Sequence, residues 1–542
     1  MELEQIEIPS SNTFASKYFH QDKHVMSFFH YDWTKEETYV ERLNDLRQRS
    51  FSRDMLVQCI QRYMQKFPMS DQVHESLEKL AQPDSVVVVG GQQAGLLTGP
   101  LYTIHKIFSI LHLAKQKEEQ LGVPVVPLFW IAGEDHDFLE VNHIFVENGM
   151  KLEKINFTVQ PLPKQMISHL SLNKEELKDW VEDVFRLLGE TSYTTELMNL
   201  VFEAIESTET MTEFFSYIIM KLFRAYGLLI IDSAYEPLRE MERAFFKALI
   251  QNERQITKHV LARQQQMKAN GWSPLIEIND TSTNLFYYNG QERLLLEFDP
   301  QTERYHSKHH EVSFTLDQLL QQVEITPQQF SNNVVSRPLM QEWLFPTLAF
   351  IAGPGEITYW GELGQAFEHL GFKMPPIVPR LHITYVERSI ERDVKELGLT
   401  LSSVIQHGVG KEKECYLASI QDEEVNQLIR ETSRWLEQQY EKIMEKGHSI
   451  EKGLTPIIDK NLRFHQNQLY YLQQKMQERQ QLKHQHQINQ YNRVQQHIKP
   501  FDSYQERSWN IFYYLNKYGV DFIDHSLNLP YSFQCPHHLI RI

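Results

Sequence analysis

A run of valines, a glycine-rich loop and a helical pattern follow one another in SVVVVGGQQAGLLTGPLYTIHK, residues 85–106. A continuous apolar run is typical of a strand that is buried on both faces, and such strands belong to parallel sheets covered by helices. The apolar residues after the loop recur on one side of a helix as far as about Lys117, and a second apolar run, residues 123–133, comes next. Strand, loop, helix and strand make one βαβ unit, so the sequence predicts an α/β fold with a parallel sheet.

The parallel sheet is expected to continue beyond this unit. Apolar runs at 227–232 and 344–353 read as further strands, whereas residues 1–80 read as helical. Residues 285–298 instead read as a hairpin that turns at Asn289-Gly290.

Two segments break the alternation of strands and helices, and we interpret both as insertions. They lie at about 145–215 and 245–335. We therefore predict a core that spans residues 1–385 and carries these two insertions.

Residues 386–500 have the character of a helical hairpin. Apolar residues recur there at intervals of seven among many charged residues, at Leu462, Leu469 and Met476. Gly447 and residues 453–456 separate two such stretches. We predict an antiparallel coiled coil that mediates self-association, followed by a helical segment, 501–542, that packs back on the core or on the coiled coil.

The composition restricts the class of protein. The chain has 542 residues, a formal net charge of −17 and three cysteines that form no CxxC pair. The negative charge disfavours binding to nucleic acid or to an anionic membrane. The apolar stretches are too short to span a bilayer, and the N-terminus lacks a signal-peptide pattern. We expect a cytoplasmic protein with neither nucleic acid nor membrane as a partner, because scattered cysteines fit a reducing compartment.

The glycine-rich loop is the first candidate binding site. A glycine loop that enters a helix exposes N–H groups and directs a positive helix end at an anion such as phosphate. Thr98 or Gly99 would cap this helix, and His105 and Lys106 lie one turn inside it. The loop matches neither the Walker A nor the GxGxxG pattern, and an alternative reading is a turn whose glycines only supply positive φ.

A cluster of acidic residues and histidines follows the second predicted strand, in WIAGEDHDFLEVNH, residues 130–143. Ligands of open α/β sheets bind beyond the carboxyl ends of the strands, where Asp135, His136 and Asp137 would lie. These side chains could bind an ammonium group, hold Mg²⁺ or transfer a proton. The alternative is a solvated acidic loop.

The third candidate follows the apolar run at 344–353, in IAGPGEITYWGELG, residues 351–364. Its glycines permit close approach of a ligand to the backbone, although a tight turn would need them as well. Arg337 and Arg380 are candidate partners of a phosphate.

These blocks together resemble the family of cysteine-adding enzymes of bacillithiol biosynthesis, the BshC family. The resemblance extends over essentially the whole chain and is carried by residues 91–106, 129–143, 352–360 and 505–507. It implies a Rossmann-type core like that of nucleotidylyltransferases, with two inserted connecting-peptide domains and a coiled coil that mediates homodimerisation. It also implies a ligase that joins the carboxyl group of cysteine to the amine of glucosaminyl-malate in the last step of bacillithiol synthesis.

The carboxyl group must be activated before an amide can form, and we expect ATP with Mg²⁺ to do so through an adenylate or an acyl phosphate. No structural metal is expected. The candidate catalytic residues are Lys106, Asp135, His136 and Asp137. The candidate binding residues are Gly91, Gln92, Gln93, Thr98, Gly99, His105, Asn142, Gly353, Gly355, Glu356, Tyr359, Trp360 and Arg380.

Two other interpretations remain open at this point. One is a metal-dependent hydrolase that uses Asp135, His136, Asp137 and His143. The other is a non-catalytic protein whose core only binds nucleotide.

Overall fold

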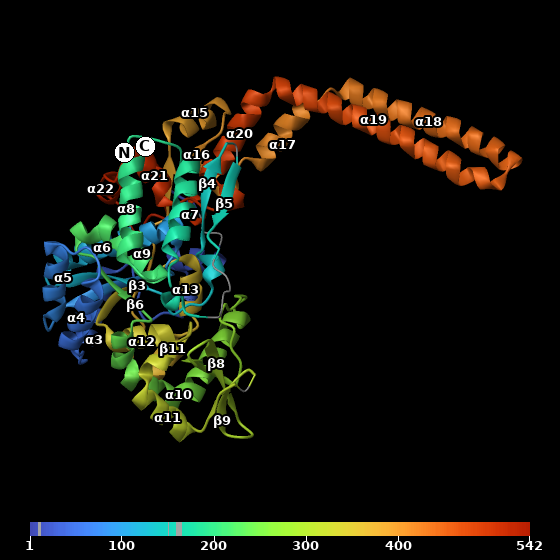
Figure 1. The fold of residues 1–542 in the computed structure, drawn as a ribbon. Helices are drawn as coiled ribbons and strands as arrows, with labels where there is room; N and C mark the ends of the chain where they lie inside the picture. The colour runs from blue at the N-terminus through green and yellow to red at the C-terminus, as the bar shows by residue number, and fades with distance from the viewer. Residues whose placement is uncertain (9–11, 150, 159–164, 310) are drawn as a thin grey trace. The chain divides into compact units, whose positions relative to one another are not determined.

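The computed structural model describes residues 1–8, 12–149, 151–158, 165–309 and 311–542. The chain forms two compact units, one made of Met1–Tyr385 together with Ser503–Ile542 and the other of Val386–Asp502. Figure 1 gives the course of the chain and the labels of its elements.

A five-stranded parallel sheet forms the centre of the first unit. Its spatial order is β13-β12-β2-β3-β6, and the strands are β2 (Val86–Gln92), β3 (Val125–Ile131), β6 (Leu229–Asp232), β12 (Thr347–Ala352) and β13 (Ile377–Pro379). In chain order, the third, second, first, fourth and fifth strands lie side by side, which is the Rossmann arrangement. The predicted α/β class is confirmed.

The apolar strands are buried because helices cover the sheet. All four valines of β2 are at most 1% exposed. Helix α6 (Leu101–Leu121) packs on β2, β3 and β12. Three N-terminal helices pack against β12, β6 and β3 respectively: α3 (Glu36–Arg47), α4 (Arg53–Met64) and α5 (Asp71–Ala81).

Two additional groups of elements interrupt the sheet. Between β3 and β6 the chain forms the antiparallel pair β4 (His143–Asn148) and β5 (Lys151–Asn156), then α7 (Lys174–Leu188), α8 (Thr194–Ser207) and α9 (Met211–Phe223). Between β6 and β12 it forms α10 (Glu236–Ala269), α11 (Leu316–Ile325), α12 (Ser336–Leu344) and a second, antiparallel sheet.

This second sheet has the order β10-β9-β8-β7-β11. Its strands are β7 (Ser282–Tyr288), β8 (Arg293–Asp299), β9 (Arg304–Ser307), β10 (Ser313–Phe314) and β11 (Phe330–Asn332). The predicted hairpin at Asn289-Gly290 is confirmed, since β7 and β8 pair across that turn. In Figure 1 these strands gather with α10 and α11.

The two ends of the chain differ from the prediction. Strand β1 (Glu2–Ile6) pairs with β15 (His537–Arg541) in the three-stranded sheet β1-β15-β14, where β14 is Ile383–Val386. Helices were predicted throughout both terminal segments, which was wrong for these strands. Each is too short to show a pattern of its own, and each depends on a partner at the other end of the chain.

The second unit is helical. It contains α15 (Arg388–Glu396), α16 (Leu401–His407), α17 (Gly410–Ser419), α18 (Glu423–Ile450), α19 (Thr455–Lys483) and α20 (Gln485–Ile498). Helices α18 and α19 pack side by side as the predicted coiled coil, joined by a turn at Lys452–Leu454.

Two details of the coiled coil correct the prediction. Gly447 lies inside α18, where an added Cβ would come within 2.5 Å of Ile458 Cδ1, so this glycine permits close packing instead of ending the helix. Met476 is 39% exposed, so it does not fill the seam as its place in the seven-residue repeat predicts. The seam continues through Gln473, whose side chain donates a hydrogen bond to Asn426 Oδ1 at 2.8 Å. No helix in the described part of the chain is both long and apolar enough to cross a membrane.

Candidate active site

The strand order determines where a ligand can approach the sheet. The chain leaves β2 toward β3 on one side, whereas β12 and β13 lie on the other side of β2. In such sheets the loops after the two central strands diverge and leave a crevice at the carboxyl ends, the usual ligand site. The loops after β2 and β12 contain the first and third candidate motifs.

Lys106 joins the end of β2 to the loop after β12. Its Nζ donates hydrogen bonds to the Gly91 carbonyl at 2.7 Å and to Glu356 Oε2 at 2.6 Å, and the side chain is 2% exposed. Burial lowers the pKa of Lys106, and the charge of Glu356 opposes that shift. Glu356 also accepts the Gly353 N–H at 2.7 Å, at the start of α13 (Pro354–Trp360). The geometry therefore fixes a cation between the two loops.

Two arginines add positive charge beside Lys106. Arg337 donates to the Tyr359 hydroxyl at 3.0 Å and lies over the rings of Phe350 and Trp360. Among the described residues it forms no ion pair with a carboxylate. Arg380, which follows β13, is 6% exposed.

Arg380 is paired with a residue that the sequence did not reveal as part of the site. Both oxygens of Glu506 accept hydrogen bonds from Arg380 at 2.8 Å, and Glu506 also contacts His105 at 2.9 Å and His382 at 2.8 Å. Burial opposes ionisation, but the charges of Arg380 and His382, together with the hydrogen bonds from Arg380 and His105, outweigh it and hold the pKa of Glu506 well below its usual range. Glu506 was missed because its partners are more than 120 residues away in the sequence.

The Asp135 carboxylate lies beyond the end of β3. It accepts hydrogen bonds from the Gln93 side chain at 2.7 Å and from the His136 and Asp137 N–H groups at 2.7 and 3.3 Å. Gln93 thereby connects the loop after β2 with the loop after β3. About a third of the Asp135 side chain, 32%, remains exposed, so the carboxylate can also meet a ligand.

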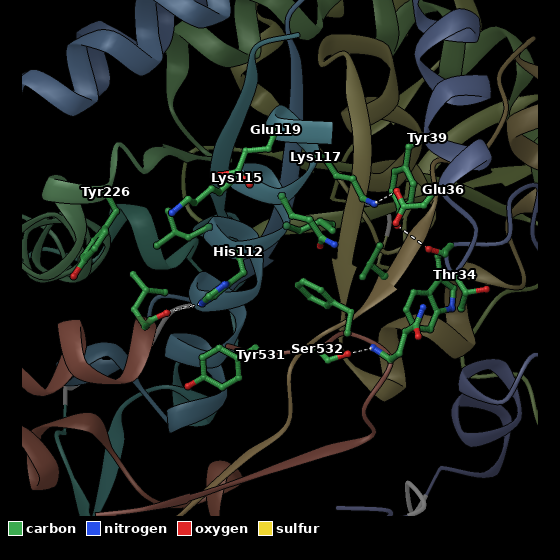
Figure 2. A pocket seen from close by; sticks show the side chains of 18 of the residues that line it. Thr34, Glu36, Tyr39, His112, Lys115, Lys117, Glu119, Tyr226, Tyr531 and Ser532 are labelled. Atoms are coloured by element: carbon green, nitrogen blue, oxygen red, sulfur yellow. Dashed lines mark hydrogen bonds and ion pairs between the residues drawn. The ribbon is translucent and has the colours of Figure 1, made fainter. Parts of the chain in front are cut away.

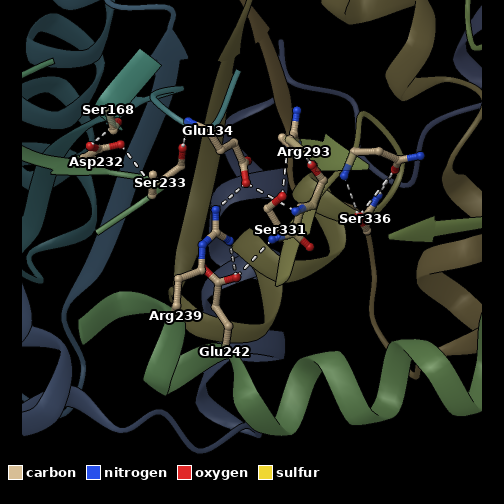
Figure 3. A network of polar contacts seen from close by, with 12 residues as sticks. Glu134, Ser168, Asp232, Ser233, Arg239, Glu242, Arg293, Ser331 and Ser336 are labelled. Carbon is tan, nitrogen blue, oxygen red and sulfur yellow. Dashed lines mark hydrogen bonds and ion pairs between the residues drawn. The ribbon is translucent and has the colours of Figure 1, made fainter. Parts of the chain in front are cut away.

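Glu134 points to a different set of partners, shown in Figure 3. Its carboxylate contacts Arg239 and accepts the Asn332 N–H at 3.2 Å, and Arg239 also donates to Glu242 at 2.7 Å. Burial raises the pKa of Glu242 to about 7, against the charge of Arg239. This network ties the loop after β3 to α10 and to β11.

Asp232 ends β6 in the same region. It bonds to Ser168 Oγ at 2.5 Å and to the Ala234 N–H at 2.9 Å. Burial raises its pKa to about 6. Its carboxylate is engaged in holding the first insertion against the sheet.

The glycine-rich loop does not offer its N–H groups to a ligand as predicted. The Gly99 N–H donates to Leu96 O and the Leu101 N–H donates to Trp509 O, both at 2.8 Å. Thr98 is fully buried. The beginning of α6 is therefore covered by the C-terminal segment, and the loop serves packing at these positions.

The remaining candidates divide between the crevice and the core. Gln92 lies 3.4 Å from Lys106 Nζ, and a Cβ added at Gly355 would have no atom within 4 Å, so the first borders the Lys106 site and the second borders open space. Trp360 is fully buried and stacks on Phe367, and His105 is also fully buried. The Asn142 side chain donates to Phe157 O at 2.9 Å. Trp360 and Asn142 thus shape the surrounding structure.

The hydrolase interpretation lacks its ligand set. In the part of the chain that the structure describes, no three His, Cys, Asp or Glu side chains are arranged to hold a metal ion.

A separate cavity of about 560 Å³, drawn in Figure 2, lies along the second half of α6. His112, Lys115 and Lys117 of α6 line it together with Tyr39 and Tyr531. None of the predicted site residues lines this cavity.

Fold and site together define a Rossmann-like α/β protein that has a cluster of charged residues at the strand crossover and a separate coiled-coil domain. Residues 1–381 match the family described as Bacillithiol biosynthesis BshC, N-terminal Rossmann-like domain, and residues 383–542 match its C-terminal coiled-coil domain. The chain belongs to the BshC family.

Curated relatives cover the whole chain. Proteins of Geobacillus sp. (strain WCH70), Bacillus licheniformis and Bacillus cereus (strain AH187) are 41%, 40% and 38% identical over 542 residues, with full coverage of both chains. Each is named as a cysteine ligase, BshC, and each name is marked as provisional.

Proposed function

We propose that this protein is a ligase that joins the carboxyl group of cysteine to the amine of glucosaminyl-malate in bacillithiol biosynthesis. The names of its relatives support a cysteine ligase. The observation that carries the proposal is the positive charge at the crossover, where Lys106, Arg337 and Arg380 face two carboxylates, Glu356 and Glu506. Such a surplus of cations suits a substrate that carries phosphates.

The residues at the crevice fit a nucleotide. Lys106 and Arg337 would hold its phosphates, and Gly355, which has open space beside it, would let the phosphates approach the backbone. Bound ATP with Mg²⁺ would supply the activation that the cysteine carboxyl needs. The chain's own contribution is to neutralise phosphate charge with side chains that are already fixed in position.

The loop after β3 would bind the amine. Asp135 would hold the ammonium group of the aminosugar, and the His136 imidazole, which is 39% exposed, would accept its proton. Holding both reactants in register can contribute up to about 7–11 kcal/mol to the lowering of the barrier.

The test is mass spectrometry of the products after the purified protein is incubated with glucosaminyl-malate, cysteine and ATP·Mg²⁺. We expect the cysteinyl amide together with one equivalent of AMP or of ADP, which also identifies the activation chemistry. Consumption of ATP without amide would contradict the proposal.

We also propose a homodimer formed through the coiled coil. On each helix, apolar side chains recur every seven residues and are exposed, namely Leu428 and Trp435 on α18 and Ile457, Phe464 and Tyr471 on α19. An exposed apolar stripe on each helix of a helical hairpin suits association with another copy. The three free cysteines further support a reducing compartment, the cytoplasm.

A further inference from the structure

Arg293 is a buried arginine that the proposed mechanism has not used. It begins β8 in the second sheet and is 8% exposed. Its Nε donates to Ser331 Oγ at 2.9 Å, and its Nη2 donates to Asn332 O at 2.5 Å. These two bonds and the Phe286 ring, 3.8 Å from Cζ, fix the guanidinium in one orientation.

The charge of Arg293 is not balanced by a direct partner. Among the described residues no carboxylate forms an ion pair with it, and its Nη1 donates to none of them. A buried charge is normally paired, because removing it from water is costly. Arg239, which is 1% exposed and close by, shows the usual arrangement, since Glu134 and Glu242 both contact it. The Arg293 guanidinium is therefore suited to pair with the anionic group of a ligand.

The position of Arg293 indicates where this anionic group would lie. The Phe286 ring that supports the guanidinium also lies 6.5 Å from the His136 ring, centroid to centroid. The negative charges that act on Arg293 are those of Glu134 and Asp135. Glu134 is occupied by Arg239, and the Asp135 carboxylate is turned toward Gln93. Arg293 and the loop that we assign to the amine thus both lie beside Phe286.

We propose that Arg293 binds a carboxylate of the acceptor substrate and so selects aminosugars that carry an acidic aglycone. This inference rests on the proposed function. Asp135 and Arg293 would bind the two ends of one molecule: Asp135 the ammonium group and Arg293 the carboxylate. In glucosaminyl-malate the amine and the malyl group occupy neighbouring carbons of the sugar, which suits two opposite charges held by one loop and one sheet.

The test compares two ligands by calorimetry, glucosaminyl-malate and methyl glucosaminide, which has the amine but no carboxylate. We expect Arg293→Gln to weaken binding of glucosaminyl-malate about 10- to 100-fold, the worth of a hydrogen-bonded charge, and to leave binding of methyl glucosaminide unchanged. Arg293→Lys keeps the charge and should recover part of the loss. Arg304→Gln is the matched control, because Arg304 bonds to Ser313 in the same sheet through Nε and Nη2 but is only half-buried.

Binding separates this inference from the proposed ligase activity, because it requires no turnover. Equal weakening of both ligands in Arg293→Gln would mean a structural role and would overturn the assignment, as would an unchanged preference for glucosaminyl-malate. In turnover assays the same variant should raise KM for glucosaminyl-malate with little change in kcat.

Discussion

At the scale of single residues, the site depends on charges that are fixed before any substrate arrives. Lys106 is held by Gly91 O and Glu356, and Arg380 is held by Glu506. Groups that are already oriented need not reorganise when charge develops in a reaction, which is why such sites stabilise transition states well. The same pairing limits the cost of burying the charges.

Glu253 is buried, and no described residue forms an ion pair with it, which predicts a dependence of stability on pH. Glu253 is 4% exposed and contacts the Tyr305 hydroxyl at 3.3 Å, and burial raises its pKa to about 7. The unfolded chain has a glutamate pKa near 4.3. At pH values between these two pKa values only the native state keeps the proton on Glu253. The free energy of unfolding therefore falls as pH rises across this interval, and the loss is complete above about pH 7.

Glu253→Gln removes this loss while keeping the shape of the side chain. Urea unfolding at pH 5 and at pH 8 measures the effect. Between these pH values we expect the free energy of unfolding of the natural protein to fall by about 2 kcal/mol relative to that of the variant. An equal difference at both pH values would show that Glu253 does not titrate in this range.

At the scale of elements, the sequence predicts well what repeats locally. The valines of β2, the glycine loop and α6 follow from periodicity, and the turn at Asn289-Gly290 follows from its dipeptide. What failed depends on distant partners. Strand β1 has no local signal because it pairs with β15 at the other end of the chain. The roles of Glu506 and Arg293 could not be predicted because their partners belong to other segments of the chain.

The glycines of the crevice separate packing from ligand access, and this gives a prediction for two of them. An alanine Cβ at Gly91 would lie 2.9 Å from Trp130 O, in the backbone of the neighbouring strand, whereas nothing lies within 4 Å at Gly355. We expect Gly91→Ala to lower the free energy of unfolding by about 1–3 kcal/mol, as overpacking does.

Gly355→Ala should change stability by less than about 1 kcal/mol in the same chemical denaturation measurement. A Gly91→Ala protein as stable as the natural one would mean that β2 and β3 can separate without cost.

At the scale of the whole molecule, the two units have different roles in the proposed function. The parallel sheet and its insertions hold the charged residues, and two helices of the second unit each present an apolar stripe that would join two copies. The resemblance in sequence covers both units, which is why the architecture could be predicted, whereas Glu506 and Arg293 were not among the predicted site residues.

The dimer proposal predicts a mass near twice 64.3 kDa in light scattering at micromolar concentration. Trp435 on α18 and Phe464 on α19 are 58% and 60% exposed, and changing both to Glu places a charge in each stripe without disturbing the seam. We expect this double variant to have a mass near 64.3 kDa. A dimer that survives both changes would place the interface elsewhere.

The measurement that tests the central claim most directly is the rate of amide formation in two variants of α6, followed by mass spectrometry. Lys106 and Lys117 are 2% and 3% exposed, and each is paired with a glutamate, but only Lys106 lies at the crevice. If the crossover is the site of ligation, Lys106→Ala forms the cysteinyl amide about 10²–10³-fold more slowly, while Lys117→Ala keeps the rate of the natural protein. Equal rates in the two variants would contradict the account.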